Sequence, residues 1–428
     1  MADSLGISML GAGNVGGGVV VALVAGVDRY AALVGAPLEL RRVLVRDASR
    51  ARDGLTADQL TTDVDDVMTD AETKVVIEVL GGEEPAREYI ERALVAGKHV
   101  VTANKEVLAK HGASLLATAS EHGVRLLYEA SVGGGIPIVH PLGRDLLAND
   151  VAAVTAIING TTNYILTAMA QEGASYEDVL ADAQELGYAE PDPTADVEGI
   201  DAAYKLSILC GLAFHVEVTP DDVTRQGITG LSASDFIYAE ELGCTIKLLA
   251  TGRLADGAVT ASVLPTLVGQ DEPLAKVDGV LNAVQVEGDL VGRVLFEGPG
   301  AGPAPTASAI LADVLDIARD ITAGRQPQPG FEYRTADVRA AADQESRYYI
   351  RMTGSNQPGV LAAVATSLGE HGINIASVIQ FGMDESAPTE EFVITTYLAN
   401  AGRLHTALEE IGGFDQVVEI GNVLQMVG

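Results

Sequence analysis

The stretch that decides the fold is Leu5-Gly6-Ile7-Ser8-Met9-Leu10-Gly11-Ala12-Gly13-Asn14-Val15-Gly16. Its first half is an apolar run that predicts a buried strand, and its second half has the spacing Gly-x-Gly-x-x-Gly. In this spacing the first glycine permits a tight turn, the second lets the backbone approach a pyrophosphate, and the third lets the next helix pack closely. The stretch therefore predicts a strand, turn and helix that bind a dinucleotide. The alternative is a flexible loop without a ligand.

Strand and helix patterns alternate after this turn. Strands are predicted at residues 40–45, 74–80 and 99–102, and helices from the turn to about residue 32 and at 85–96. This alternation is typical of a doubly wound parallel sheet. We therefore expect an α/β protein whose residues 1–135 form a Rossmann-type NAD(P)-binding domain, completed by a helix at 303–321.

A membrane-spanning helix is the competing interpretation of the start of the chain. Residues 7–27 carry no charge over 21 positions, which is close to the length of a spanning helix. Six of these residues are glycine, and that density is costly inside a helix. We therefore favour the strand, turn and helix, and we expect no membrane partner.

Three further regions follow. Residues 136–302 combine long helical windows with alternating strands, so we expect an α+β domain for substrate binding and dimerisation. Residues 322–346 are rich in Pro, Gln and Ala and predict a linker. Residues 347–428 follow the order strand, helix, strand, strand, helix, strand, so we expect an appended βαββαβ module.

The charge balance excludes some partners. The chain has 27 Lys and Arg against 60 Asp and Glu, a net charge of −33, which repels phosphate backbones and anionic lipids. We therefore expect no nucleic acid partner.

The two cysteines, Cys210 and Cys244, have no neighbouring Cys or His at metal-ligand spacing. This cysteine usage is typical of a reducing compartment, and the start of the chain has no basic signal segment, so we expect a cytoplasmic protein.

The end of the second predicted strand bears on the choice of cofactor. An acidic residue at this position would bind the ribose hydroxyls of NAD, whereas an arginine would favour the 2′-phosphate of NADP. The sequence has both, Arg46 and Asp47, and Arg46 falls at the tip of the strand. We therefore favour NADPH and keep NADH open. The alternative for Arg46 is an ordinary solvated charge.

Lysines mark two candidate positions for chemistry. Lys205 lies four residues after Asp201 on a predicted apolar helix that follows a Pro-rich acidic loop. A surface ion pair is the simpler interpretation of this spacing, but a lysine on a mostly buried helix needs a partner and can then donate a proton. Lys105 follows the strand at 99–102, at the carboxyl edge of the sheet where ligands bind. Its alternative is a surface lysine.

Two glycine-rich loops are further candidates for ligand contacts. Gly133-Gly134-Gly135 could be a hinge, or a place where bare carbonyl groups approach a ligand or a cation. Gly298-Pro299-Gly300-Ala301-Gly302-Pro303 could be a crossover between domains, or a flat backbone surface against a ring.

Longer motifs resemble the homoserine dehydrogenase family. They are Asn159-Gly160-Thr161-Thr162-Asn163-Tyr164-Ile165-Leu166, then Glu185-Leu186-Gly187-Tyr188-Ala189-Glu190-Pro191-Asp192-Pro193-Thr194-Ala195-Asp196-Val197-Glu198-Gly199-Ile200-Asp201 with Lys205. The Gly-Pro-Gly-Ala-Gly-Pro loop is similar too, and the final module resembles an ACT domain. The resemblance implies NAD(P)H-dependent, reversible reduction of L-aspartate 4-semialdehyde to L-homoserine, in the biosynthesis of threonine, methionine and isoleucine.

The same resemblance implies roles for individual residues. Lys205 would donate the proton to the aldehyde oxygen, with Lys105 in the same pocket. Glu190 and Asp201 would hold the substrate's ammonium group, with Asp196 supporting the site and Gly187 beside the substrate. A monovalent cation, usually sodium, would be held by residues matching Glu129, Val132, Gly134 and Ile136, mostly through their carbonyls. The expected cofactor contacts are Gly11, Ala12, Gly13, Asn14, Val15, Gly16, Arg46, Gly81, Ala103, Lys105, Gly187 and Gly302.

The resemblance also bears on regulation and on the competing functions. We expect threonine as an effector, bound between paired ACT modules near Gly354, Asn356 and Gly359, and a homodimer or homotetramer. Asn356-Gln357 stands before Pro358-Gly359, where the family often has an acidic residue. The alternatives are a catalytically silent amino-acid sensor, or another ACT-tailed dehydrogenase acting on a 2-hydroxy acid, although no histidine lies in an evident catalytic context.

Overall fold

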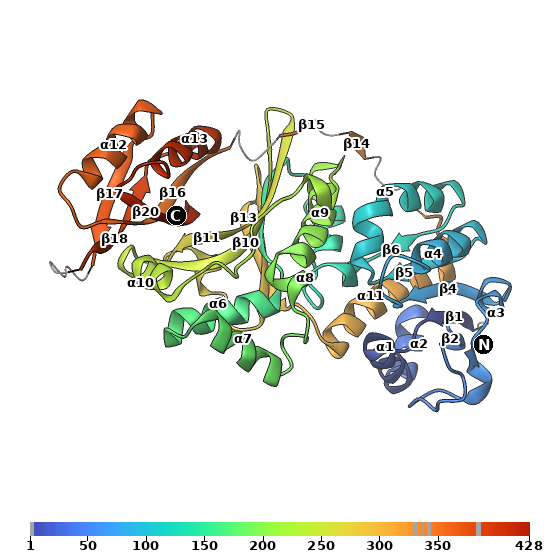
Figure 1. Ribbon diagram of the computed structural model, residues 1–428. Helices are drawn as coiled ribbons and strands as arrows, with labels where there is room; N and C mark the ends of the chain where they lie inside the picture. Colours follow the sequence, from blue (N-terminus) through green and yellow to red (C-terminus); the bar gives the residue numbers. More distant parts are fainter. Residues whose placement is uncertain (1–3, 328–332, 336, 340–343, 382–386) are drawn as a thin grey trace. The chain divides into compact units, whose positions relative to one another are not determined.

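The computed structural model describes residues 4–327, 333–335, 337–339, 344–381 and 387–428. The chain divides into two compact units, each built from several segments. The first unit comprises Met1–Val154, Tyr204–Pro220 and Asn282–Ala336, and the second comprises Thr155–Ala203, Asp221–Leu281 and Asp337–Gly428. Figure 1 shows the order of the elements along the chain.

A parallel sheet of six strands forms the centre of the first unit. Its strand order is β3-β2-β1-β4-β5-β6, which is the doubly wound arrangement that the alternating pattern predicts. The strands are β1 (Leu5–Leu10), β2 (Leu38–Leu44), β3 (Leu60–Thr61), β4 (Thr73–Glu78), β5 (His99–Thr102) and β6 (Leu126–Leu127). Because β1 is buried along its whole length, it needs the continuous apolar run that the sequence gives it.

Helices cover this sheet. They are α1 (Asn14–Ala25), α2 (Val27–Val34), α3 (Asp65–Met68), α4 (Ala86–Val95), α5 (Lys105–Glu121) and α11 (Pro303–Thr322). The late helix α11 packs against α1, and its buried residues Val314 and Ile317 share one apolar core with Ile7 and Val19. The first unit also holds the neighbouring strands β12 (Leu281–Gly288) and β13 (Gly292–Pro299).

One predicted helix is wrong in its length. The apolar helix expected to continue to about residue 32 ends at Ala25, and α2 starts at Val27 after a bend of 77°. A Cβ at Gly26 would lie 2.3 Å from the ring of Tyr30, so a larger residue at this break would require that ring to move. Among the described residues no single helix is long and apolar enough to cross a membrane, although the bent pair α1 and α2 meets that test by length and composition.

The second unit begins with helices and continues into long strands. Its helices before the last module are α6 (Gly160–Glu172), α7 (Tyr176–Glu185), α8 (Thr194–Val197) and α10 (Ala233–Glu241). Its strands there are β9 (Thr224–Arg225), β10 (Cys244–Ala255) and β11 (Ala258–Gly269), and β10 and β11 form an antiparallel pair. Some elements cross the division between the units, among them β7 (Val151–Ile157), α9 (Ile200–Phe214) and, by its first residue, β12.

The last part of the second unit has the expected βαββαβ order. Its main elements are β16 (Glu345–Ser355), α12 (Val360–Glu370), β17 (Ile375–Gln380), β18 (Thr389–Thr396), α13 (Ala401–Ile411) and β20 (Val417–Val427), with a short β19 (Ala399–Asn400). Their sheet order is β20-β16-β18-β17. One face of this sheet packs against α12 and α13 through a core that contains Ile350, Met352 and Val364.

The module is joined to the rest of the second unit more closely than an appended domain would be. The last strand of the module, β20, continues to Val427, and its end pairs with β11. On α10, the fully buried Asp235 accepts hydrogen bonds from Arg351 at 2.8 Å, Tyr349 at 3.0 Å and Asn422 at 2.7 Å. The expected module therefore makes contacts at this edge that the sequence did not predict, because the pairing of β20 with a strand outside the module leaves no local pattern.

The segment expected as a linker, 322–346, lies partly outside the described residues. Its described part contains β14 (Arg334–Thr335), which pairs with β8 (Val216–Glu217), and β15 (Asp337–Val338), which pairs with β11. Strands of two residues are too short to show a periodic pattern, so the composition alone predicted a linker.

Candidate functional site

The glycine turn of the first unit has the geometry that close approach of a ligand requires. Gly11 has a φ of +106°, and an added Cβ would lie 2.8 Å from the Val79 carbonyl oxygen, so only glycine fits. A Cβ on Gly16 would lie 2.6 Å from the carbonyl oxygen of Gly11, so this residue lets α1 pack closely on the turn. Gly13 is exposed with open space around it, which leaves its backbone accessible.

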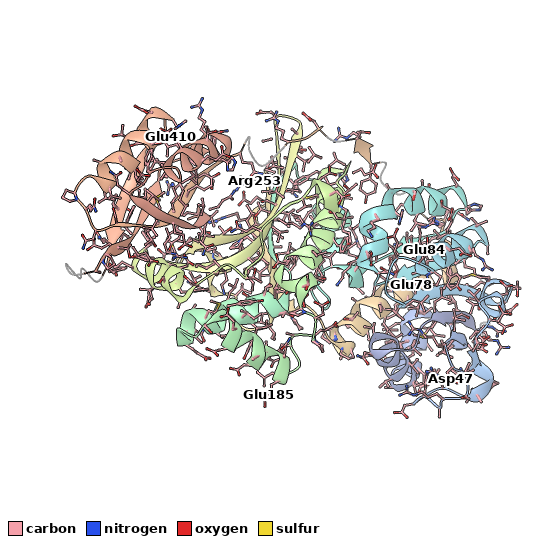
Figure 2. All side chains as sticks on the ribbon, in the orientation of Figure 1. Asp47, Glu78, Glu84, Glu185, Arg253 and Glu410 are labelled. Carbon is pink, nitrogen blue, oxygen red and sulfur yellow. The ribbon has the colours of Figure 1, made fainter. Side chains whose placement is uncertain are left out.

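The end of β2 lies beside this turn, since Gly11 N donates to the carbonyl oxygen of Leu44 at 3.0 Å. Asp47 accepts hydrogen bonds from the backbone N–H of Ser49 at 2.9 Å and from its hydroxyl at 2.6 Å, and these lower its pKa (Figure 2). Arg46 is exposed. The carboxylate is therefore engaged in its own turn, whereas the guanidinium reaches solvent.

A buried carboxylate that the sequence analysis missed organises the ends of β4 and β5. Glu78 is fully buried, and burial raises its pKa (Figure 2). It accepts hydrogen bonds from Leu80 N at 2.7 Å and from the Thr102 hydroxyl at 2.5 Å. Thr102 Oγ1 in turn accepts from Asn104 N at 3.0 Å, and the Asn104 side chain donates to the carbonyl oxygen of Gly82 at 2.8 Å.

These hydrogen bonds hold the backbone of Leu80, Gly82 and Asn104 in place. Those residues are the chain neighbours of the expected cofactor residues Gly81, Ala103 and Lys105. Lys105 is the first residue of α5, and Asn104 caps that helix by accepting from Val107 N. Gly81 has a φ of +77° and is exposed. A glutamate in the apolar run at 74–80 was the only sequence signal for this network.

The two glycine-rich loops of the first unit contact each other. A Cβ on Gly134 would lie 2.3 Å from the Gly300 carbonyl oxygen, and Gly135 N donates to the carbonyl oxygen of Pro299 at 3.1 Å. Gly302, at the start of α11, has a φ of +116°. Neither loop is therefore a free hinge, because each fills the space beside the other.

The four residues expected to hold a cation lie around the first of these loops. Glu129, Val132, Gly134 and Ile136 are all buried. The Glu129 carboxylate accepts three backbone N–H groups, from Ile138, Val139 and His140, at 2.6 to 2.9 Å. If Glu129 binds the expected cation, the ligand atom would therefore be its backbone carbonyl oxygen. Carbonyl oxygens suit a hard cation.

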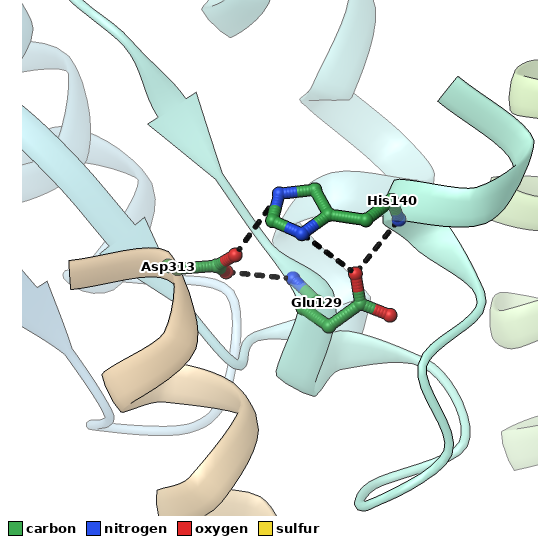
Figure 3. A group of neighbouring side chains, drawn as sticks. All are labelled: Glu129, His140 and Asp313. Carbon is green, nitrogen blue, oxygen red and sulfur yellow. Dashed lines mark hydrogen bonds and ion pairs between the residues drawn. The ribbon is translucent and has the colours of Figure 1, made fainter. Parts of the chain in front are cut away.

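Figure 3 shows a further cluster at the same place, formed by Glu129, His140 and Asp313. The Asp313 carboxylate accepts from Glu129 N at 2.9 Å, and its other oxygen lies 3.5 Å from His140 Nε2. Burial raises the pKa of Asp313 well above its usual range. One ligand atom from each residue could approach a metal ion, but the Glu129 carboxylate already caps three N–H groups. We interpret the cluster as a brace between α11 and the loop.

In the second unit, two of the expected substrate residues share one partner. The side-chain amide of Asn159 donates to Asp196 at 2.6 Å and to Asp201 at 3.0 Å. Asn159 also caps α6, and it is buried. Asp201 is buried and Asp196 is partly buried. Asn159 belongs to a motif that carried the family resemblance, but nothing in the sequence indicated that it contacts the two carboxylates.

The other expected residues of this part have different surroundings. Glu190 is exposed and lies outside this hydrogen-bonded group. Gly187 follows α7 with a φ of +76°, in a turn closed by its N–H to the carbonyl oxygen of Gln184. Lys205 is partly buried on α9, one helical turn after Asp201. The structure therefore brings Asp196 and Asp201 together through Asn159.

A cavity of about 280 Å³ lies in the last module. It is lined by Gly354, Asn356 and Gly359, which were the expected effector residues, together with Gln380 and Glu390. Phe392 forms part of its wall. The cavity lies at the start of α12, where Gly359 takes a φ of +103°.

Comparisons with known proteins cover nearly the whole chain. Family models described as homoserine dehydrogenase NAD-binding domain, homoserine dehydrogenase and ACT domain match residues 11–129, 137–315 and 348–414 respectively. The homoserine dehydrogenase of Synechocystis sp. is 41% identical over 436 residues, which cover 98% of this chain and 99% of that protein.

Solved structures agree with this result. A homoserine dehydrogenase from Thiobacillus denitrificans superposes with a TM-score of 0.93 at 38% identity, covering 99% of this chain and 98% of that one. A hyperthermophilic archaeal homoserine dehydrogenase in complex with NADPH has a TM-score of 0.63 at 26% identity, covering 77% of this chain and 99% of that one.

Proposed function

The chain belongs to the homoserine dehydrogenase family, and from this premise we propose that it reduces L-aspartate 4-semialdehyde to L-homoserine with NADPH, with Lys205 as the proton donor. The alternatives of a silent sensor and of a 2-hydroxy-acid dehydrogenase are not favoured, because full-length relatives are named homoserine dehydrogenase. The observation that carries the proposal is the pair of carboxylates Asp196 and Asp201, both held by Asn159, with Asp201 on α9, the helix that also carries Lys205.

The glycine turn and the strand ends beside it suit a dinucleotide. A bound nicotinamide supplies the hydride for the reduction. Gly13 leaves room for the pyrophosphate at the start of α1, where unpaired N–H groups favour an anion, and Gly11 and Gly16 allow the tight turn and close packing that place this helix end. Exposed Arg46 supports NADPH, because Asp47 is engaged with Ser49. The archaeal relative solved with NADPH supports the same choice.

Reduction of an aldehyde also needs an acid for the oxygen. Lys205 is partly buried, so its ammonium group would act where water is partly excluded and where it stabilises developing negative charge most. It would donate its proton to the aldehyde oxygen, with Lys105 assisting. Asp201 and Glu190 would bind the substrate's ammonium group, and Asp196 would support Asp201.

A monovalent cation fits the loop that contains Gly134. We assign its ligands to the carbonyls of Glu129, Val132, Gly134 and Ile136, because the carboxylate of Glu129 is already engaged. The cation's part would be structural: it would hold the loop that packs against Gly300, and Asp313 would fix the start of this loop from α11.

The ACT domain suggests an amino-acid effector. We propose threonine at the cavity near Gly354, Asn356 and Gly359, between paired modules in a homodimer or homotetramer. A cytoplasmic location remains a prediction.

The proposed activity is tested by NADPH formation from L-homoserine and NADP with the purified full-length protein, and absence of turnover at saturating concentrations would overturn it.

A further inference from the structure

We propose that Asn159 is a positioning residue for the substrate's ammonium group, because its neutral amide fixes the carboxylates of Asp196 and Asp201 without neutralising them. The inference rests on the proposed function, since it requires that these carboxylates face an ammonium group. The positioning role itself requires no metal ion and no cofactor other than the nicotinamide cofactor of the proposed reaction.

The orientation of the Asn159 amide is determined by its contacts. Its oxygen accepts from the backbone N–H of Thr162 at 2.9 Å and from the Thr162 hydroxyl at 3.1 Å. A backbone N–H can only donate, so the amide oxygen must face Thr162 and the NH₂ group must face the acids. Both amide hydrogens are then used, one for Asp196 at 2.6 Å and one for Asp201 at 3.0 Å.

The charge of this arrangement suits a cationic ligand. Two carboxylates that bind the same amide group carry like charge and favour a cation beside them. A lysine or arginine in place of Asn159 would hold the acids equally well, but its positive charge would compete with the ammonium group of the substrate. An amide adds no charge, so it orders the acids and leaves their attraction for an ammonium group intact.

Burial makes this positioning strict. Asn159 is 6% exposed and Asp201 is 5% exposed, so neither side chain is held in place mainly by water. Asn159 is also fixed by the start of α6, because its side chain caps this helix by accepting the N–H of Thr162. The positions of the two carboxylates therefore follow the position of this helix end.

The same side chain also caps α6, so a test must separate the cap from the donor. Ser and Asp are both good N-cap residues, and each retains an oxygen that accepts the N–H of Thr162. Asn159→Ser removes the amide donor. Asn159→Asp keeps the shape of the side chain and replaces the amide donor with an acceptor oxygen, so that a third carboxylate repels the other two.

The experiment compares wild type, Asn159→Ser and Asn159→Asp in the full-length protein. The amino acid L-homoserine and 4-hydroxybutyrate, which lacks the amino group, are oxidised with NADP. We expect KM for L-homoserine to rise about 10- to 100-fold, as for loss of a hydrogen bond to a charged group, with the larger rise in Asn159→Asp. KM for NADP and kcat/KM for 4-hydroxybutyrate should stay within about twofold of wild type.

Asn400 provides the matched control, because it caps α13 by accepting from Arg403 N. Asn400→Ser and Asn400→Asp make the same chemical changes at a helix start away from the two acids, and KM for L-homoserine should not change. An unaltered KM for L-homoserine in folded Asn159 variants would overturn the inference. An equal fall in kcat/KM for L-homoserine and for 4-hydroxybutyrate would overturn it too, because it would show a general structural effect.

The two failures can be told apart. Wild type that does not oxidise L-homoserine would refute the proposed function itself. Active wild type with unchanged Asn159→Ser and Asn159→Asp kinetics would refute only the positioning role of Asn159.

Discussion

The hydroxyl of Thr102 donates a 2.5 Å hydrogen bond to the buried carboxylate of Glu78, and this contact joins the ends of two neighbouring parallel strands. Ligands of doubly wound sheets bind at this edge. Thr102 also receives the N–H of Asn104, which precedes Lys105. The buried Glu78 side chain and its Thr102 partner therefore set the backbone beside the expected cofactor contacts Gly81 and Ala103.

Replacing Glu78 by leucine should impair cofactor binding and catalysis together. The change leaves the N–H of Leu80 and the hydroxyl of Thr102 without their acceptor, at a cost of about 1–3 kcal/mol for each group. We expect kcat/KM for NADP to fall at least about 10-fold. Glu78→Gln retains an acceptor oxygen and should recover most of this loss in steady-state assays. Equal activity of Glu78→Leu and wild type would contradict this role.

Arg46→Ala should change cofactor preference. Loss of a charge-assisted hydrogen bond to the 2′-phosphate predicts an increase of about 10- to 100-fold in KM for NADP, with little change in KM for NAD. Initial rates with both cofactors measure this difference. Arg50→Ala is the comparison variant, since Arg50 is a second exposed arginine in the same segment. Equal effects of Arg46→Ala on both cofactors would dismiss the assignment.

His99 should make folding stability depend on pH. Burial, helped by the nearby Arg125 charge, lowers its pKa from 6.5 to about 4. Its Nδ1 accepts from Arg125 N at 3.0 Å, so the folded state needs the neutral ring. The folded pKa is below the unfolded value, so this stabilisation is complete above pH 6.5 and is lost as pH falls toward 4.

A variant isolates this contribution from the other titrating groups. Asn at position 99 offers an acceptor oxygen where Nδ1 stood, but it does not titrate. The loss of unfolding free energy between pH 6.5 and 4, measured by chemical denaturation, should therefore be smaller in His99→Asn than in wild type. Identical pH profiles would show that His99 does not contribute.

Threonine should bind to the last module. Isothermal titration of the full-length protein should show saturable heat with L-threonine, because the cavity of about 280 Å³ is lined by Gly354 and by the polar residues Asn356 and Glu390. L-valine has nearly the same shape without the hydroxyl, and it should bind more weakly. No heat with L-threonine would leave the module with a role in assembly alone.

The sequence predicted the local elements well. The strand Leu5–Leu10, the helix Ile200–Phe214 and the βαββαβ order of the last module follow from apolar periodicity and glycine placement, and the structure confirms them. The helix expected to continue past Gly26 was wrong because the sequence pattern stays apolar there, whereas the chain bends at Gly26, where the Tyr30 ring occupies the space that a Cβ would need.

Contacts between distant segments could not be predicted in the same way. Asn159 meets Asp196 and Asp201 across about forty residues, and Asp313 reaches Glu129 from α11 across 184 residues. Such pairs have no periodic signal in a single sequence. The residues expected at the site came from motif matches, while their partners Glu78 and Asn159 became visible only in the fold.

The most direct test of the account is the rate of L-homoserine oxidation by Lys205→Ala with saturating NADP. Removal of a general acid and base predicts a fall in kcat of about 10²- to 10⁴-fold with a near-normal dissociation constant for NADPH. Lys276→Ala, at an exposed lysine, should match wild type. Turnover by Lys205→Ala at the wild-type rate would contradict the assignment of Lys205 as the residue that moves the proton.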